Sequence, residues 1–482
     1  MQLKRLLHVI GAVVAASGVA MLSAVVVSLI YGEIETGLRL GAASLVTMAA
    51  GGTAWRMFPA PKRMTAREGF AIVGLSWIVM TAFGTLPYVF TAEIFNINDA
   101  FFETAAGYST TGASIVADPA LLSHGVLFWR ALTQWMGGMG IIVLSVAILP
   151  LLGIGGVELA RAESPGPMPD RLTPRFRETA KRLWLVYVAF TLAEIVLLWL
   201  GDMNLFEAVA HSFTTMSTGG FGTDASSMNA FSGYAQWVVI IFMFLAGASF
   251  ALHFRGLPKP IEYVRNAEFR LYSAIIVAAS AVAIIGTWGD QIERTVRDGL
   301  FTVVSLVTTT GYATADFGVW PLALQVMVFG LMFVGGMAGS TGGSVKPYRL
   351  GVLYNASKAD LQQVIHPRGI FVVRFGTSSV PDQIVKSVQS FFLLYMFLFM
   401  TGTFIFAMIV DVAGMDIAFV DSASAVASSL GNVGPGLGAV GPSSNYAAVP
   451  GLGKWLLSLL MIVGRLEIFP IVLLFQRELW RR

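Results

Sequence analysis

The sequence contains no cysteine and few charged residues, and both absences exclude classes of protein. Without cysteine, the chain has neither a disulfide nor a thiolate metal site. Charged residues make up 12% of the chain, whereas soluble domains have about 25%, and 56% of the residues are hydrophobic. The net charge of +3 is small, so nucleic acid is not an expected partner. The composition predicts a polytopic membrane protein.

Hydrophobic runs long enough to cross a bilayer, which takes about 20 residues in a helix, recur along the chain. The first run is longer than the apolar core of a signal peptide, so we expect a retained span. The expected spans are 6–30, 38–58, 69–92, 124–152, 183–201, 233–255, 270–288, 320–353, 384–410 and 451–476.

Basic residues are distributed unevenly between the loops that join these spans. Of the 31 Lys and Arg residues, 25 lie at the two termini or in the loops 56–67, 161–182, 255–270 and 346–386. Because cytoplasmic loops are enriched in Lys and Arg, we expect these loops and both termini to be cytoplasmic.

Four shorter segments lie between the spans and share one plan. Each starts with an acidic residue, continues with small and apolar residues, and reaches a glycine thirteen residues later. A segment of this length is too short to span a bilayer, so it predicts a half-helix with an irregular loop at its tip. The segments are 99–112, 207–220, 298–311 and 421–434.

This repetition predicts a shared ion path. Irregular backbone at membrane depth is tolerated only where protein buries it or where it lines a watery cavity. Half-helices whose carboxyl ends point inward favour a cation there, and rings of carbonyl oxygens select potassium in channels. The acids are expected to cap the helix starts. Ordinary glycine loops between helices are the alternative, but four segments in register favour the ion path.

The expected eighth span, 320–353, is too long for one crossing and is rich in glycine. Each glycine disfavours a helix by about 1 kcal/mol relative to alanine, so we expect a break near 335–345. Close helix packing is the alternative explanation. A phosphate-binding P-loop is disfavoured, because the Gly-Lys-Ser/Thr ending is absent and Pro347 follows Lys346. The glycines are Gly335, Gly336, Gly339, Gly342 and Gly343.

Arg465 is the one basic residue near the middle of an expected span. A buried arginine in a membrane is costly and usually functional. We expect Arg465 to face the cavity below the glycine loops, where carbonyl oxygens accept its hydrogen bonds and its charge opposes cation passage. The alternative is a structural ion pair with Glu467 or Glu194. His211 and the glycines 137, 138 and 140 are expected to serve packing.

Five motifs resemble those of the Trk/Ktr/HKT superfamily of potassium transporters, and in particular its bacterial TrkH/TrkG branch. As they stand here, they are Gln134-Trp-Met-Gly-Gly-Met-Gly, Arg161-Ala-Glu-Ser-Pro-Gly-Pro, Gly339-Ser-Thr-Gly-Gly-Ser-Val-Lys, Asn432-Val-Gly-Pro-Gly-Leu-Gly and Gly464-Arg-Leu-Glu-Ile-Phe-Pro. The resemblance implies an all-α membrane protein with four pseudo-symmetric helix–pore-loop–helix repeats around a central ion pore. A helix pair at 1–66 precedes the repeats at 67–160, 161–260, 261–375 and 376–482.

The resemblance also implies potassium uptake across the bacterial inner membrane and assigns roles to residues. Potassium would bind at a selectivity filter of Thr110, Thr111, Gly112, Thr218, Gly219, Gly220, Thr309, Thr310, Gly311, Asn432, Val433 and Gly434. All four filter positions are glycine, which the resemblance associates with potassium rather than sodium. Asn432-Val433 replaces Thr-Thr, so strict fourfold geometry is not expected. The glycine-rich break, which ends at Lys346, would be an intramembrane loop that obstructs the pore and moves to open it. Arg465, by its expected position below the filter, would help to hold this gate shut.

The expected partners follow from the same resemblance. They are a second copy of the chain in a homodimer, and a cytosolic nucleotide-binding ring of the TrkA type. The basic loops 161–182 and 346–386 are candidates for docking this ring, with the positive charge of cytoplasmic loops in general as the alternative explanation. No cofactor and no enzymatic activity are expected, because no nucleophile, metal or cofactor constellation appears. The alternative function is a potassium symporter coupled to protons or sodium, for which the intramembrane acid Glu194 is the candidate. A polar bridge between helices explains Glu194 equally well.

Overall fold

The computed structural model describes residues 3–59, 65–147 and 173–480, and these residues are nearly all helical or in short connections. Among them, five helices are long and apolar enough to cross a membrane, or six if the bent pair α10–α11 counts as one span. The other expected spans contain helices that are broken, shorter or less apolar. The first two residues, 60–64, 148–172 and the last two lie outside this description, and with them the Arg161 motif and most of the basic loop 161–182.

A hairpin of two long helices, α1 (Leu3–Ile30) and α2 (Ile34–Met57), precedes the repeats. The two helices touch backbone to backbone, because a side chain at Gly11 or Gly51 would overlap main-chain atoms of the opposite helix. Small residues at such contacts allow the close approach that stabilises helix pairs in membranes. The hairpin packs against α3 and α6 of the first repeat.

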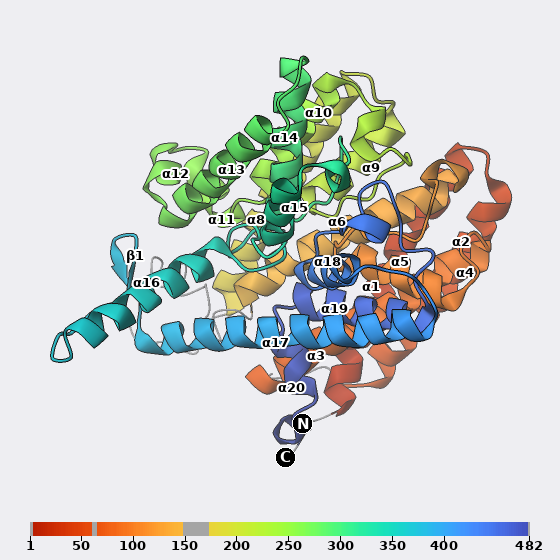
Figure 1. Cartoon of the computed structure of the whole chain (residues 1–482). Helices are drawn as coiled ribbons and strands as arrows, with labels where there is room; N and C mark the ends of the chain where they lie inside the picture. Colours follow the sequence, from red (N-terminus) through yellow and green to blue (C-terminus); the bar gives the residue numbers. More distant parts are fainter. Residues whose placement is uncertain (1–2, 60–64, 148–172, 481–482) are drawn as a thin grey trace.

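Four repeats of outer helix, short helix and inner helix follow (Figure 1). The outer helices are α3 (Ala66–Gly84) continued by α4 (Leu86–Thr91), α8 (Thr173–Trp199), α13 (Ala267–Gly286) and α17 (Asp382–Val412). The short helices are α5 (Ile97–Tyr108), α9 (Leu205–Met216), α14 (Ile292–Val307) and α18 (Phe419–Gly431). The inner helices are α6 (His124–Ala147), α10 (Gly233–Ala246) with α11 (Phe250–Gly256), α15 (Leu322–Leu331) with α16 (Pro347–Ile365), and α19 (Gly451–Arg465) with α20 (Phe469–Leu474).

The remaining elements are short. One turn of 3-10 helix follows each glycine loop, and a small hairpin lies between α16 and α17. The elements are η1 (Pro119–Leu121), η3 (Ser227–Ala230), η4 (Phe317–Val319), η5 (Gly438–Val440), α12 (Ile261–Arg265), α21 (Arg477–Trp480), and the antiparallel strands β1 (Arg374–Phe375) and β2 (Ser378–Ser379).

The repeats close into a ring. Short helices contact the inner helix of the preceding repeat: α9 packs against α6, α14 against α10, and α5 against α19 of the fourth repeat. The contact between α5 and α19 joins the last repeat to the first. The buried core therefore continues around the short helices, which lie at the centre of the molecule.

Among the residues that the structure describes, three inner helices are broken, although the sequence predicted a break in only one. The expected break in 320–353 is confirmed, since α15 ends at Leu331 and α16 begins at Pro347. Breaks within the expected spans 233–255 and 451–476 were not predicted from the sequence. Helices α10 and α11 meet at 99°, and α19 and α20 are separated by a γ-turn in which Ile468 has a φ of 68°. A β-branched residue with positive φ is strained, so neighbouring contacts must hold this turn.

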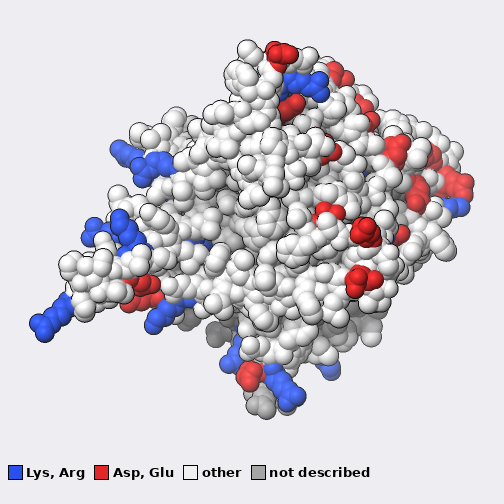
Figure 2. Space-filling view, in the orientation of Figure 1, with Lys and Arg blue, Asp and Glu red and all other residues white. Residues whose placement is uncertain are grey.

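Charge is segregated between the two ends of the molecule. On the face drawn in Figure 2, most Lys and Arg side chains gather at the end that carries α12, α16 and the C-terminus in Figure 1, and most Asp and Glu side chains gather at the opposite end. The first turns of α1 lie near α20, since Leu474 packs against the cluster that contains Leu6 and Ile10. This charge distribution agrees with the positive-inside pattern that the sequence predicted.

We predict that Gly51→Val destabilises the α1–α2 hairpin, because its side chain would overlap the main chain at Ala15. Overpacking of this kind costs about 1–3 kcal/mol. Thermal unfolding of the detergent-solubilised protein, followed by size-exclusion chromatography, measures the effect. Gly52→Val is the matched control, since a Cβ at that position would meet no atom of another helix within 4 Å. Equal melting temperatures for the two variants would contradict the close-packing account.

Candidate functional site

The four glycine loops, residues 109–112, 217–220, 308–311 and 431–434, adopt one backbone conformation. In each loop a polar residue and the glycine two positions later both have positive φ, which is uncommon for residues other than glycine. The polar residues are Thr110 (53°), Thr218 (54°), Thr309 (59°) and Asn432 (54°). The glycines are Gly112 (78°), Gly220 (77°), Gly311 (82°) and Gly434 (107°). Asn432 thus keeps the shared backbone despite its different side chain.

Backbone hydrogen bonds turn the loop amides back toward the short helices. The residue before each glycine donates to a carbonyl five residues earlier, at 2.8–2.9 Å, as Thr111 does to Ala106 and Thr310 does to Ser305. Among the described residues, no hydrogen bond reaches the carbonyl oxygens of Thr111, Thr310 or Val433. These oxygens therefore remain available to a ligand.

The loops touch one another in cyclic order. A side chain at the glycine of one loop would collide with a carbonyl oxygen of the next loop, so only glycine fits there. The contacts run from Gly112 to the oxygen of Gly219, from Gly220 to that of Thr310, from Gly311 to that of Val433, and from Gly434 to that of Thr111. The four loops therefore form one ring of carbonyl oxygens. Asn432 reinforces the ring by donating from Nδ2 to Thr111 Oγ1 at 3.0 Å.

The electrostatics of this ring favour a cation. The short helices end at the loops, so their carboxyl ends, each with a partial negative charge, converge on the ring. The acidic residues near the amino ends of the short helices do not all cap those helices, although the sequence predicted that they would. Glu207 forms a capping box with Asn204, as expected. Asp298 does not start its helix, because α14 begins earlier, at Ile292.

Residues 332–346, here called the break segment, lie directly beneath the glycine loops. The amide of Gly343 donates to Thr309 Oγ1 at 2.7 Å. The hydroxyl of Thr341 donates to the carbonyl oxygen of Met216 at 3.1 Å, which is at the carboxyl end of α9. A side chain at Gly343 would also collide with the Gly431 carbonyl. The break segment is thus bonded to the ends of the short helices that form the ring.

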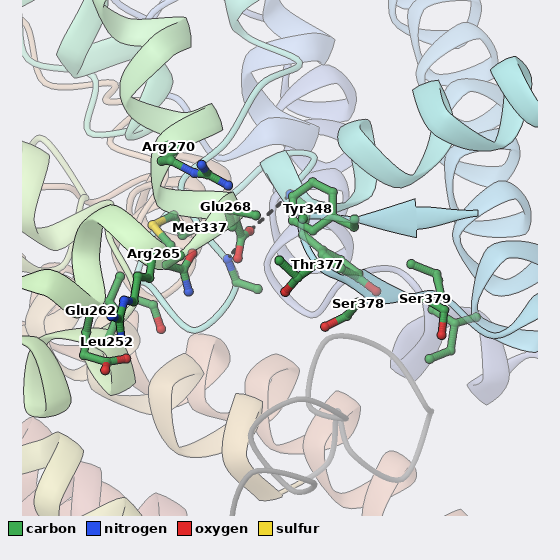
Figure 3. A pocket seen from close by; sticks show the side chains of 18 of the residues that line it. Leu252, Glu262, Arg265, Glu268, Arg270, Met337, Tyr348, Thr377, Ser378 and Ser379 are labelled. Atoms are coloured by element: carbon green, nitrogen blue, oxygen red, sulfur yellow. Dashed lines mark hydrogen bonds between the residues drawn. The ribbon is translucent and has the colours of Figure 1, made fainter. Parts of the chain in front are cut away.

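The other side of the break segment is held by the second inner helix and by α13. The amide of Met337 donates to the carbonyl of Gly247 at 2.8 Å, within the α10–α11 bend. Glu268, in the first turn of α13, accepts from the amides of Ala338 at 2.9 Å and Tyr348 at 3.2 Å. Figure 3 shows Glu268 between Met337 and Tyr348, on the wall of a cavity of about 560 Å³. This cavity borders the break segment on the basic side of the molecule.

Arg465 is buried and reaches the break segment through its guanidinium. It donates to the carbonyl oxygens of Thr341 at 2.5 Å and Gly137 at 3.1 Å. Lys346 donates to the carbonyl oxygens of Gly342 and Gly343 within the same segment. Two buried cations therefore lie just below the ring, and backbone carbonyls rather than carboxylates contact them.

The expected alternative, an ion pair of Arg465 with Glu467 or Glu194, does not form among the described residues. Glu467 instead pairs with Arg349 of α16, and the Arg349 guanidinium lies 3.9 Å from the centre of the Phe391 ring. Because Glu467 belongs to the strained break after α19, this pair links α16 to the helix that carries Arg465.

Comparison with known proteins agrees with this architecture. The family model TrkH, described as "Cation transport protein", matches residues 39–261 and 289–481. The chain is 37% identical to the Trk system potassium uptake protein TrkH of Salmonella typhimurium and 34% identical to TrkG of Escherichia coli, over 100% and 98% of each chain. The crystal structure of the potassium transporter TrkH from Vibrio parahaemolyticus matches with a TM-score of 0.90 at 33% identity, over 100% of both chains.

The chain belongs to the TrkH family. The resemblance inferred from the sequence motifs is therefore confirmed, as is the all-α fold of four pseudo-symmetric repeats that follow a helix pair. The matched regions include all four glycine loops, the break segment and Arg465.

Three side chains that support the TrkH-type ring were not predicted from the sequence. Gln134 donates from Nε2 to the carbonyl of Gly219 at 2.8 Å and accepts from the amide of Phe221 at 3.1 Å. Arg130 and Glu103 form a buried ion pair behind the first two loops. Glu103 lies inside the short, mostly apolar helix α5, where an acidic residue is unusual. This position was the sequence feature that could have indicated a buried ion pair.

The residues expected to serve packing lie in packed positions. His211 is fully buried and contacts the rings of Phe231 and Tyr312. Side chains at positions 137, 138 and 140 would overlap Tyr108, Ser217 and Trp77. The carbonyl of Gly137 has a second role, since it accepts a hydrogen bond from Arg465.

We predict that Thr309→Val loosens the break segment, because it removes the acceptor of the Gly343 amide without changing the side-chain shape. Loss of one buried hydrogen bond costs about 1 kcal/mol, so amide exchange in a peptide covering 334–346 should accelerate several-fold. Hydrogen exchange with mass spectrometry measures it. Thr302→Val, which removes a buried hydroxyl without a partner among the described residues, is the control. Equal exchange in both variants would show that this bond does not hold the segment.

Proposed function

We propose that this chain takes up potassium across the bacterial inner membrane through a central pore. The single observation that carries the proposal is the ring of carbonyl oxygens, in which four loops with one backbone conformation touch in cyclic order. Rings of this kind replace the hydration shell of potassium in channels. The relatives named as potassium uptake proteins match the chain over its full length, which supports the same substrate.

The glycine loops are the selectivity filter in this proposal, and potassium is the substrate bound there. Carbonyl oxygens coordinate the ion, and the converging helix ends stabilise its charge. The filter comprises Thr110, Thr111, Gly112, Thr218, Gly219, Gly220, Thr309, Thr310, Gly311, Asn432, Val433 and Gly434.

The break segment and Arg465 are the gate. The break segment lies across the path beneath the filter, and its hydrogen bonds to Thr309 and Met216 hold it there. The charge of Arg465 raises the barrier to a cation at the same level. Opening requires the break segment and Arg465 to leave this position together, since the Thr341 carbonyl bonds the guanidinium. The gate residues are Gly335, Gly336, Gly339, Gly342, Gly343, Lys346 and Arg465.

The basic end of the molecule faces the cytoplasm in this proposal, and both termini lie there. A cytosolic nucleotide-binding ring of the TrkA type regulates the gate from that side, and the chain acts as a homodimer, as its family resemblance implies. Support comes from geometry: Glu268 and the cavity beside it connect the basic surface to the break segment. A partner that displaces α13 or α16 would therefore act directly on the gate.

A potassium symporter coupled to protons or sodium is the second candidate. Glu194 favours it, because this carboxyl group is completely buried in α8, which packs against the short helix α9. An acid at membrane depth is a recurrent element of proton relays. A coupled carrier differs from a pore in that its reversal potential shifts with the gradient of the coupled ion.

We predict that Gly112→Ser weakens selectivity for potassium over sodium about tenfold, a change of about 1.4 kcal/mol. The serine side chain would collide with the Gly219 carbonyl and would strain a backbone with a φ of 78°. Reversal potentials in proteoliposomes, with potassium and sodium on opposite sides, measure the ratio. Gly330→Ser is the control, because a Cβ there meets no neighbouring group. Flux that follows the proton gradient and ignores Gly112→Ser would favour the symporter.

We predict that Arg465→Ala increases potassium flux in the absence of the regulator by about tenfold. The change removes a buried positive charge below the filter and two hydrogen bonds to the backbone. Tracer uptake into proteoliposomes measures it. Arg465→Lys keeps the charge without the forked geometry, so its flux should lie between those of the wild type and Arg465→Ala. Unchanged flux and unchanged regulation in Arg465→Ala would refute the gating role.

A further inference from the structure

We propose that the ion pair of Arg130 and Glu103 is a positioning element that sets the ion selectivity of the pore. The inference rests on the proposed function, since it takes the glycine loops to be the filter. Neither residue contacts the ion in this account. The pair acts through the backbone segments that leave the first and second glycine loops toward the acidic face.

The pair is buried in a place where charge is costly. Its side chains are 2% and 0% exposed, and Arg130 Nε and Nη2 approach the same Glu103 carboxyl oxygen at 2.9 and 2.8 Å. Of the ion pairs among the described residues, no other has both side chains so fully buried. Burying such a pair adds little net stability, because desolvation offsets the attraction. The role of the pair must therefore lie in the contacts that it makes with the neighbouring backbone and side chains.

Those contacts reach the segments beyond two filter loops. Glu103 accepts from the Ser114 hydroxyl at 2.9 Å and from the Ile115 amide at 3.0 Å, both just past Gly112. Arg130 donates to the carbonyl of Gly222 at 3.3 Å, just past Gly220. Its guanidinium also lies 4.2 Å from the centre of the Phe221 ring. One ion pair thus spans the first two filter segments.

The same network extends to the fourth filter loop. The carbonyl of Ser114 accepts from the Tyr446 amide at 2.9 Å, and the Tyr446 hydroxyl donates to the carbonyl of Gly434 at 3.0 Å. The Ser114 hydroxyl also accepts from Arg130 at 3.1 Å. A shift of the ion pair would therefore be transmitted to Gly434 through Ser114 and Tyr446. Hydrogen bonds therefore connect this one pair to three of the four filter segments.

The other repeats have no equivalent charge. The positions that correspond to Glu103, four residues after each segment's acid, are His211, Thr302 and Ala425. The third loop is held instead by Tyr312, whose hydroxyl contacts Thr214 and the carbonyl of Phe221. The ion pair therefore breaks the fourfold symmetry at the first repeat, and its loss should let the first and second loops move apart.

Two single substitutions separate positioning from simple electrostatics. Glu103→Gln leaves a positive charge near the filter, and Arg130→Met leaves a negative one. If the pair acted only through its field, the two variants would change cation flux in opposite directions and leave selectivity intact. If the pair positions the filter, both variants lower the ratio of potassium to sodium permeability.

The double variant Glu103→Gln/Arg130→Met addresses folding. Removing one partner of a buried pair leaves an uncompensated charge, whereas replacing both is often tolerated. We therefore expect the double variant to recover the melting temperature but not the selectivity. Arg130→Lys keeps the charge and loses the fork that reaches Gly222, so a partial loss of selectivity is expected. Glu293→Gln/Arg297→Met is the control, since this pair at the start of α14 makes no hydrogen bond to the glycine loops among the described residues.

Reversal potentials in proteoliposomes under opposed potassium and sodium gradients provide the test. We expect the permeability ratio to fall about tenfold in both single variants and in the double variant, and to stay unchanged in the control. An unchanged ratio in the double variant or in Arg130→Lys, or opposite flux changes at constant ratio, would overturn the proposal. Gly112→Ser is measured alongside. If it lowers the ratio while the pair variants do not, only this inference fails; if it has no effect, the filter assignment fails.

Discussion

The close approach of four glycine loops at the centre of the molecule is the constraint on which the rest of the structure depends. Each loop leaves a short helix through two residues with positive φ, and each glycine contacts a carbonyl oxygen of its neighbour. Backbone this irregular is stable inside a membrane protein only when surrounding groups bind its amides and hold its shape. The short helices bind the amides, and Gln134, Tyr446 and the Arg130–Glu103 pair hold the shape. The carbonyl oxygens that remain can coordinate a cation.

The same arrangement explains why the basic side of the molecule is assembled from broken helices. A continuous inner helix could not place the amide of Gly343 against Thr309 or the carbonyl of Thr341 against Arg465. The break between α15 and α16 brings irregular backbone beneath the ring, and the bend between α10 and α11 provides a partner for it at Gly247. The basic surface then connects to the break segment through Glu268.

Repetition made much of the fold and of the ring predictable from the sequence. The thirteen-residue interval from acid to glycine located all four loops, and glycine clustering located the break in 320–353. The breaks at Gly247–Ser249 and at Ile468 were missed, because tertiary contacts rather than local glycine content hold them. The start of α14 was also missed, because Asp298 resembled a cap although the helix continues back to Ile292. The Arg130–Glu103 pair joins residues 27 positions apart, which no local pattern reveals.

A direct view of the bound ion tests the central claim most sharply. Thallium and rubidium substitute chemically for potassium, and their anomalous scattering locates them in crystals of the protein. The account predicts an anomalous peak on the axis of the ring, within coordination distance of the carbonyl oxygens of Thr111, Thr310 and Val433, and its loss when excess potassium competes. A peak elsewhere in the protein, with none at the ring, would contradict the claim that the glycine loops bind the transported ion.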